Sequence, residues 1–230
     1  MAALKGRRVL IGTPAYDWKA DVRFVHSLGL TLKLCAQQGV DLRWLFPPGH
    51  ALVQHARNEL IRDALKFGYD DLVFIDSDQD WLPEDFVRLL SYDVDCVGAP
   101  VRKKTDETVW NVKARGGFFS FGAHPHYELL TAPDLTIGTG LLRLNRHALQ
   151  KLFDASEKYT VSGGEETPWT FDVGPVEGVL VGEDTHVCER LRGLGIMIWL
   201  DPTIVCGHNE GGKRYAGDFA KWLSEMQGQA

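Results

Sequence analysis

The sequence predicts an α/β fold with a Rossmann-like, mostly parallel central sheet flanked by helices and a small antiparallel sheet. Over the first 100 residues, short apolar runs alternate with segments whose apolar residues recur at helical spacing. The apolar runs are continuous, as in strands that are buried on both faces. Residues 108–144 are instead rich in glycine, β-branched and aromatic residues, which is typical of short antiparallel strands.

The first half of the chain alternates strand and helix, as in right-handed βαβ units. Gly39 and Gly68 follow the first two helical segments, where glycine commonly ends a helix. Pro83 is followed by two acidic residues, which favours a third helix start. The expected elements are strands at 8–12, 40–46, 72–75 and 94–98 and helices at 22–38, 51–67 and 83–90.

The second half is less regular. Short antiparallel strands are expected within 108–144, including the run at 117–121, and a polar loop is expected at 156–175. Beyond Gly207 we expect a glycine-containing loop and a short terminal helix. The other expected elements are helices at 145–154 and 184–194 and strands at 196–200 and 203–206, which complete the sheet.

The composition suits one large globular domain. Of 230 residues, 44% are hydrophobic and 24% are charged, and the net charge of −6 gives no global attraction to nucleic acid or anionic membrane. The four cysteines are scattered and form no C-x-x-C pair, so we expect core thiols in a reducing, cytoplasmic setting. No apolar stretch approaches the ~20 residues of a membrane helix.

Two carboxylates follow the most apolar strand, in the segment Leu72-Val73-Phe74-Ile75-Asp76-Ser77-Asp78. The carboxyl end of such a strand lies at the edge where open α/β sheets bind ligands. Asp76 and Asp78 repel each other unless a cation lies between them, which favours a divalent metal that carries a phosphate or diphosphate. An acidic turn is the alternative. A calcium loop is excluded, because Trp81 stands where that loop needs glycine and Val87 where it needs glutamate.

Two later segments carry acidic or imidazole side chains. Glu183 and Asp184 begin an expected helix. Acidic side chains in this position stabilise the helix dipole. At a crevice, a carboxylate in the same position can instead act as a general base. His208 follows an expected strand end and, beside carboxylates, favours Mn²⁺ or a similar ion over Ca²⁺. Nothing near His124 and His126 completes a metal set, so we expect surface positions for both.

Three further motifs are weak on their own. Arg57 suits bidentate phosphate contacts but is also typical of an exposed helix face. Thr13 and Pro14 follow the first strand, where backbone groups can hold a nucleobase or ribose. The turn Gly138-Thr139-Gly140 lets the backbone approach a ligand closely.

Taken in order, these segments resemble glycosyltransferases of the A-type (GT-A) fold, over Val9 to about His208. The resemblance implies one domain over 1–230, with a nucleotide-sugar-binding half at 1–100, an acceptor and catalytic half at 101–208 and a terminal loop and helix at 209–230. The motifs that carry it are Ala56-Arg57-Asn58, Phe74 to Asp78, Gly138-Thr139-Gly140, Gly182 to Leu191, Trp199 to Pro202 and Gly207-His208.

The resemblance also implies roles at the donor. Asp78 and His208 bind Mn²⁺ or Mg²⁺, and Asp76 contacts the ribose or reaches the metal through water. The donor is a nucleotide-sugar, with a UDP-sugar favoured. The residues implied to line the nucleotide pocket are Thr13, Pro14 and Arg57.

On the acceptor side, the resemblance implies that Asp184 deprotonates the acceptor hydroxyl, as in inverting members, with Glu183 beside it. Gly138 to Gly140 border the sugar and the acceptor. Retaining members share the D-x-D and the late histidine without using this carboxylate as the base.

The segments Gly12 to Asp17 and Tyr215 to Phe219 resemble segments of small glycosyltransferases found in tailed-phage genomes. That similarity implies a hydroxymethylated base in DNA or a glycan as the acceptor. Arg102-Lys103-Lys104 and Lys113 are expected to line a basic groove for DNA. A nucleotidyltransferase and a non-catalytic sugar-nucleotide or glycan-binding module remain alternatives, and the former is disfavoured because no lysine-bearing, glycine-rich loop follows the first strand.

Overall fold

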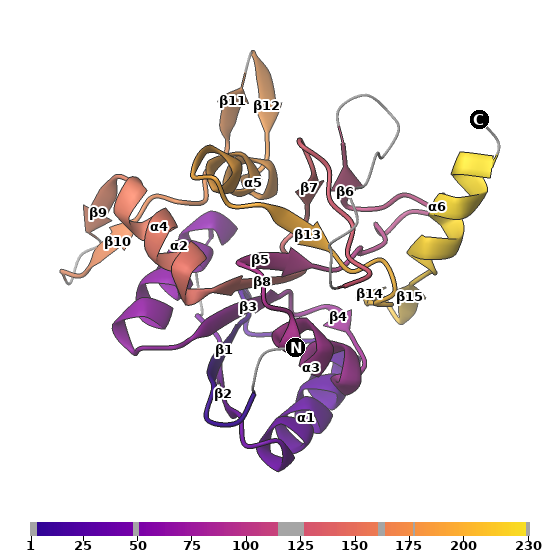
Figure 1. The fold of residues 1–230 in the computed structure, drawn as a ribbon, viewed down its shortest axis with the longest axis horizontal. Coiled ribbons are helices and arrows are strands. Elements are labelled where there is room, and N and C mark those ends of the chain that lie inside the picture. Colours follow the sequence, from indigo (N-terminus) through magenta and orange to yellow (C-terminus); the bar gives the residue numbers. More distant parts are fainter. Residues whose placement is uncertain (1–3, 48–50, 115–126, 161–163, 177, 229–230) are drawn as a thin grey trace.

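The computed structural model describes residues 4–47, 51–114, 127–160, 164–176 and 178–228. Its centre is a six-stranded sheet in the order β13-β5-β8-β3-β1-β2 (Figure 1). β1 runs parallel to β2 and β3, and β13 runs parallel to β5. The strands are β1 (Arg8–Gly12), β2 (Asp41–Leu45), β3 (Asp71–Ile75), β5 (Cys96–Gly98), β8 (Leu141–Asn145) and β13 (Ile198–Leu200). The expected mixed α/β fold with a mostly parallel sheet is therefore confirmed.

β8 lies between β3 and β5 and is antiparallel to both, with Ile75 opposite Leu141 and Gly98 opposite Leu142. Short antiparallel strands were expected within 108–144, and the structure contains them: Val112–Lys113 pairs antiparallel with Thr136–Ile137. The entry of β8 into the central sheet was not expected; its continuous buried run from Leu141 to Leu144 suits a strand covered on both faces.

Helices cover both faces of the sheet (Figure 1). In β3 every residue is buried, and alternate side chains point to opposite faces, so that Leu72 and Phe74 pack on one side and Val73 and Ile75 on the other. The helices on the Phe74 face are α2 (Val53–Lys66), α4 (Arg146–Ala155) and α5 (Glu183–Gly193), and those on the Val73 face are α1 (Val22–Gln37) and α3 (Pro83–Ser91).

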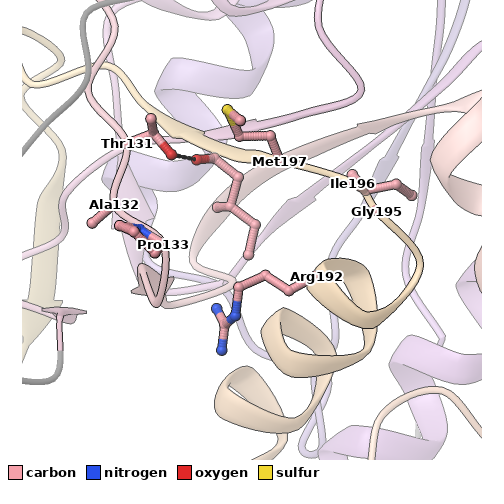
Figure 2. Close-up of a pocket in the computed structure, with 8 residues that line it drawn as sticks. Thr131, Ala132, Pro133, Arg192, Gly195, Ile196 and Met197 are labelled. Carbon is pink, nitrogen blue, oxygen red and sulfur yellow. Dashed lines mark hydrogen bonds between the residues drawn. The ribbon is translucent and has the colours of Figure 1, made fainter.

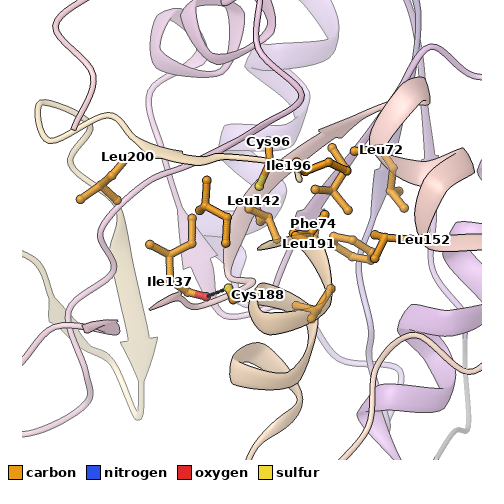
Figure 3. Packing of buried hydrophobic residues seen from close by; sticks show 14 of the residues in the cluster. Leu72, Phe74, Cys96, Ile137, Leu142, Leu152, Cys188, Leu191, Ile196 and Leu200 are labelled. Atoms are coloured by element: carbon orange, nitrogen blue, oxygen red, sulfur yellow. Dashed lines mark hydrogen bonds between the residues drawn. The ribbon is translucent and has the colours of Figure 1, made fainter. Parts of the chain in front are cut away.

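Figure 3 shows the first of these layers from close by: Phe74 and Leu142 of the sheet pack against Leu152 of α4 and Leu191 of α5. The four cysteines are buried and unpaired with one another, as expected for core thiols. No helix within the described ranges is long and apolar enough to cross a membrane.

Smaller sheets surround the central one. A three-stranded sheet pairs β14 with β15 and β4, and Figure 1 shows the β11–β12 hairpin projecting from the body of the protein. The remaining elements are β4 (Gln79–Asp80), β6 (Val112–Lys113), β7 (Thr136–Ile137), β9 (Lys158–Thr160), β10 (Glu166–Pro168), β11 (Gly174–Val176), β12 (Val179–Val181), β14 (Gly207–Glu210), β15 (Lys213–Tyr215) and α6 (Phe219–Gly228).

Several expected boundaries were wrong. The expected polar loop at 156–175 holds β9, β10 and the start of β11, because its polar and β-branched residues pair in hairpins. The expected strand at 203–206 is absent, and the strand β14 begins only at Gly207. The expected loop after Gly207 is a hairpin that turns at Gly211 and Gly212, both with positive φ, where glycine costs least. The expected strand at 117–121 and the surface positions of His124 and His126 lie outside the described residues.

Candidate functional site

The candidate site starts where β3 ends. All of β3 is buried, so the chain reaches the edge of the sheet only after Ile75. There the backbone N–H of Asp76 donates to the carbonyl of Gly140, which leads into β8, at 3.3 Å. The residues after β3 and those before β8 therefore lie together at one edge of the sheet.

Arg57 joins three carboxylates at this edge, and we call these four residues the Arg57 cluster. The guanidinium donates from Nη2 to Asp76 Oδ1 at 2.9 Å and from Nη1 to Glu183 Oε1 at 2.5 Å. Nη1 also lies 3.6 Å from Asp184 Oδ1. Burial alone would lower the pKa of Arg57, but the three carboxylates outweigh burial and raise it. The arginine expected to contact a nucleotide thus already binds the acidic residues of the site.

Asp184 is held in place by Thr139. Its Oδ1 accepts hydrogen bonds from Thr139 Oγ1 at 2.6 Å and from the Thr139 backbone N–H at 3.2 Å. Burial raises the pKa of Asp184, and the charge of Arg57 and the hydrogen bond from Thr139 offset only part of that rise. A carboxylate with a raised pKa is a stronger base, which suits proton abstraction from a hydroxyl.

Asp78 belongs to a second group, the Asp78 cluster, with His208 and Lys104. Its Oδ2 lies 2.5 Å from Lys104 Nζ and 3.5 Å from His208 Nε2. His208 reaches this position because β14 pairs with β4, with His208 opposite Gln79. Burial acts to raise the pKa of Asp78, but the hydrogen bonds from His208 and Lys104 outweigh it and lower the pKa.

Two observations bear on whether the Asp78 cluster fits a divalent metal. Asp78 Oδ1 is buried and has no hydrogen-bond partner, so one carboxylate oxygen is available as a ligand. His208 Nδ1 lies 2.9 Å from the Arg102 carbonyl oxygen. A proton on Nδ1 donated to that carbonyl leaves the Nε2 lone pair free toward Asp78, which is the usual second contact of a metal-binding histidine.

Asp76 contacts a different partner from Asp78 and His208. It was expected to contact the ribose or to reach the metal through water, and its carboxylate oxygen Oδ1 binds Arg57. Over the described ranges, no group of three or more histidine, cysteine, aspartate or glutamate side chains comes together as a metal site. The residues present fit a metal held by two protein ligands, with the remaining coordination left to substrate and water.

Thr13 and Pro14 lie after β1, at the same edge of the sheet. The backbone N–H of Thr13 donates to the Leu45 carbonyl at 3.0 Å, and its Oγ1 accepts from Trp44 Nε1 at 3.2 Å. The Trp44 ring in turn contacts Phe46, with centroids 5.4 Å apart. Sequence reasoning missed this aromatic group, although tryptophan and phenylalanine around a strand end are a signal that could have found it.

Gly138 and Gly140 have close protein neighbours. A Cβ at Gly140 would lie 2.0 Å from Gln79 Nε2, and one at Gly138 would lie 2.3 Å from Asn111 Nδ2. The close approach expected for a ligand is therefore made by side chains of the chain itself. Glycine at these positions lets the residues before β8 pass close to the residues after β3 and β5.

The four basic residues expected to line a groove for DNA have different surroundings. Arg102 donates to the backbone carbonyls of Ala216 and Asp106, and Lys104 binds Asp78. Lys103 and Lys113 are exposed. Two of the four cations are thus engaged within the protein.

A pocket of about 570 Å³ lies elsewhere, beside β13 (Figure 2). Its lining is mainly apolar and includes Pro133, Met197 and Ile198, with Arg192 at one side. None of the residues of the Arg57 and Asp78 clusters lines it. This cavity is therefore not part of the candidate site, which is defined by the contacts among its side chains.

No protein-family model matches the chain, and no curated protein matches it by sequence. Among solved structures, the fold is similar to A197 from STIV, with a TM-score of 0.61 and 14% identity over 93% of this chain and 91% of that one. Weaker likenesses are to a glycosyltransferase involved in the glycosylation of the major capsid of PBCV-1 (TM-score 0.36, 13% identity, 63% of this chain and 62% of that one) and to the nucleoside-diphosphate-sugar pyrophosphorylase from Vibrio cholerae RC9 (TM-score 0.40, 12% identity, 84% and 90%). The likeness to A197 supports the fold alone.

Proposed function

We propose that this chain is a metal-dependent glycosyltransferase of the inverting type. It moves a sugar from a nucleoside-diphosphate donor, with UDP-sugars favoured, to a hydroxyl group of a hydroxymethylated base in DNA or of a glycan. The main support is that Asp76 and Asp78, two positions apart after β3, belong to two different clusters of side chains. Asp76 joins a cluster that contains a carboxylate of raised pKa, and Asp78 joins an imidazole.

These two groups are close enough to serve one reaction. Two residues of extended chain span at most about 7 Å, so the backbones of Asp76 and Asp78 are no further apart than that. A sugar ring with its leaving diphosphate is larger than this distance. A donor whose diphosphate lies at the Asp78 cluster can therefore reach the Arg57 cluster with its sugar.

The Asp78 cluster would hold the metal. Asp78 supplies a carboxylate and His208 supplies Nε2, a mixed set that suits Mn²⁺. When bound, the ion supplies positive charge that stabilises the diphosphate as it leaves. Asp78 and His208 thereby fix the position of the leaving group.

Asp184 acts as the base. Its Oδ1 is occupied by Thr139 and lies near Arg57, whereas no hydrogen bond to Oδ2 is found in the described part of the chain. The acceptor O–H gives its proton to Oδ2 as the oxygen bonds to the anomeric carbon. The bond from that carbon to the diphosphate oxygen breaks, and the diphosphate leaves with the electron pair. Arg57 and Thr139 keep the carboxylate aimed during this step.

The donor is tested by measuring nucleoside diphosphate released from a panel of UDP- and other nucleotide-sugars with Mn²⁺, in the presence of glycans and hydroxymethylated DNA. Asp78→Ala is expected to abolish release, and Asp154→Ala, which makes the same change at an exposed position of α4, is expected to retain it. Release undiminished by EDTA would contradict metal dependence. Pyrophosphate as the product would indicate a nucleotidyltransferase, and tight donor binding without turnover would indicate a binding module.

The base is tested by Asp184→Asn. We expect kcat to fall by about 10²–10⁴, the usual contribution of a general base, with donor binding retained. Glu189→Gln, the matched change on the same helix α5, is expected to retain wild-type turnover. Full activity of the Asp184→Asn protein would exclude Asp184 as the base.

A further inference from the structure

We propose that Lys104 is a tethered cation that occupies the metal-facing side of Asp78 until a divalent ion displaces it. This inference deepens the proposed function, since it rests on Asp78 and His208 as metal ligands. It gives a role to a lysine that sequence reasoning had placed in a groove for DNA.

The first argument is position. Lys104 Nζ lies 2.5 Å from Asp78 Oδ2, the same oxygen that lies 3.5 Å from His208 Nε2. Two ligands that share one ion at about 2.1 Å each lie about 3.0–3.4 Å apart for ordinary ligand angles. The spacing of Oδ2 and Nε2 is close to that of a ligand pair. The ammonium group contacts one member of the pair, so an ion and the ammonium compete for Oδ2.

The second argument is the incomplete satisfaction of Asp78. One of its oxygens, Oδ2, contacts both Lys104 and His208, while Oδ1 is buried without a hydrogen-bond partner. A buried oxygen of a charged carboxylate without a partner costs free energy. Lys104 therefore neutralises the charge of Asp78 without satisfying the whole group, and a metal ion with open coordination positions can do both.

The third argument is that Lys104 has somewhere to go. It lies in a loop closed by the bridge between Arg102 and Trp110, and its side chain is 24% exposed. Glu210 Oε1 lies 3.6 Å from the same Nζ and is itself 63% exposed. The flexible lysine side chain can leave Asp78, keep Glu210 as its partner and remain beside the diphosphate of an arriving donor.

The test is Mn²⁺ affinity of the donor-free protein, measured from the electron paramagnetic resonance signal of free Mn²⁺. Lys104→Met is expected to bind Mn²⁺ about fivefold more tightly than the wild type, the factor that corresponds to loss of one partly exposed ion pair. Lys104→Arg keeps the competing charge and is expected to bind as the wild type does. Lys103→Met removes the same charge from the neighbouring exposed residue and is the matched control.

A second measurement uses the wild-type protein and does not depend on a variant that folds. Acetic anhydride modifies exposed amines faster than amines held by a part-buried carboxylate such as Asp78, and mass spectrometry reports modification at each lysine. Mn²⁺ is expected to increase acetylation of Lys104 and to leave that of Lys103 unchanged. The proposal is overturned if Mn²⁺ does not change acetylation of Lys104, if Lys104→Met binds Mn²⁺ no more tightly than Lys103→Met, or if no Mn²⁺ binds.

These outcomes separate the inference from the proposed function. Tighter Mn²⁺ binding by Lys104→Met in a protein that turns over no nucleotide-sugar supports the displaced lysine and contradicts the transferase. Sugar transfer without Mn²⁺ binding supports a transferase and contradicts the displaced lysine.

Discussion

Replacement of Arg57 by methionine is expected to destabilise the fold by about 2–3 kcal/mol. The Arg57 side chain is only 4% exposed and is shared by three carboxylates of Asp76, Glu183 and Asp184. Removal of one partner of a buried ion pair costs about 3–5 kcal/mol, because a charge is left without compensation. The carboxylates here are 20–39% exposed and can be hydrated afterwards, so we expect a value below that range.

Urea unfolding followed by circular dichroism at pH 7 measures this loss, since the unfolding free energy falls linearly with urea. Arg62→Met is the control on the same helix: Arg62 is 17% exposed, against 4% for Arg57, and binds Asp63 and Thr167, so its loss is expected to cost less, about 1–2 kcal/mol. Adding Asp184→Asn to Arg57→Met removes one of the unpaired charges and is expected to restore part of the stability.

The destabilisation caused by Arg57→Met is expected to be smaller at acid pH. The pKa of Asp184 is raised in the folded protein by burial, and Arg57 opposes that rise. A carboxyl group with a raised pKa contributes stability that is present at acid pH and lost as pH rises through the folded pKa. The cost of Arg57→Met is therefore expected to be smaller at pH 5 than at pH 7. An equal cost for Arg57→Met and Arg62→Met, at both pH values, would refute the role given to Arg57.

Two further predictions concern His208 and Gly98. The pKa of His208 is raised, since its hydrogen bond to Asp78 outweighs the opposite effect of burial, so its ion pair stabilises the fold below pH 6.5 and is lost as pH rises through the raised pKa. In EDTA, the melting temperature of the wild type is expected to fall more between pH 6 and pH 9 than that of His208→Gln, and parallel curves would contradict this. A Cβ at Gly98 would lie 2.6 Å from Ile137 Cδ1 and 2.9 Å from the Leu141 carbonyl oxygen. Gly98→Ala is therefore expected to lower the free energy of unfolding in urea by about 1–3 kcal/mol. An unchanged urea midpoint would show that the sheet can relax there.

The fold could be predicted as far as local pattern decides it. The alternating apolar runs and amphipathic segments of the first 100 residues correspond to β1, α1, β2, α2, β3, α3 and β5 with ends shifted by one or two residues. Strand order and direction could not be predicted, because they depend on partners distant in the chain. Arg143 shows this: it is fully buried in β8 and lies 3.6 Å from the buried Asp71 of β3, a pairing that no periodicity indicates.

The candidate site was predicted in part for the same reason. The position of Asp76 and Asp78 after a buried strand followed from the apolar run. The expected approach of His208 to Asp78 is present, but it comes from the pairing of β14 with β4 and not from a strand at 203–206 that ends beside β3. The Arg57 cluster and the contact of Lys104 with Asp78 were not predicted. A lysine in a polar loop is ordinary in sequence, and only the folded loop brings it to the carboxylate.

The reversed direction of β8 decides which loops meet at the site. A strand that runs in the same direction as most of the sheet places the residues that follow it at the site, as β1 and β3 do for Thr13 and Asp76. β8 runs the other way, so it delivers the residues that precede it, and Thr139 thus reaches Asp184. One inverted strand in the middle of the sheet lets an entry loop and several exit loops share the same rim.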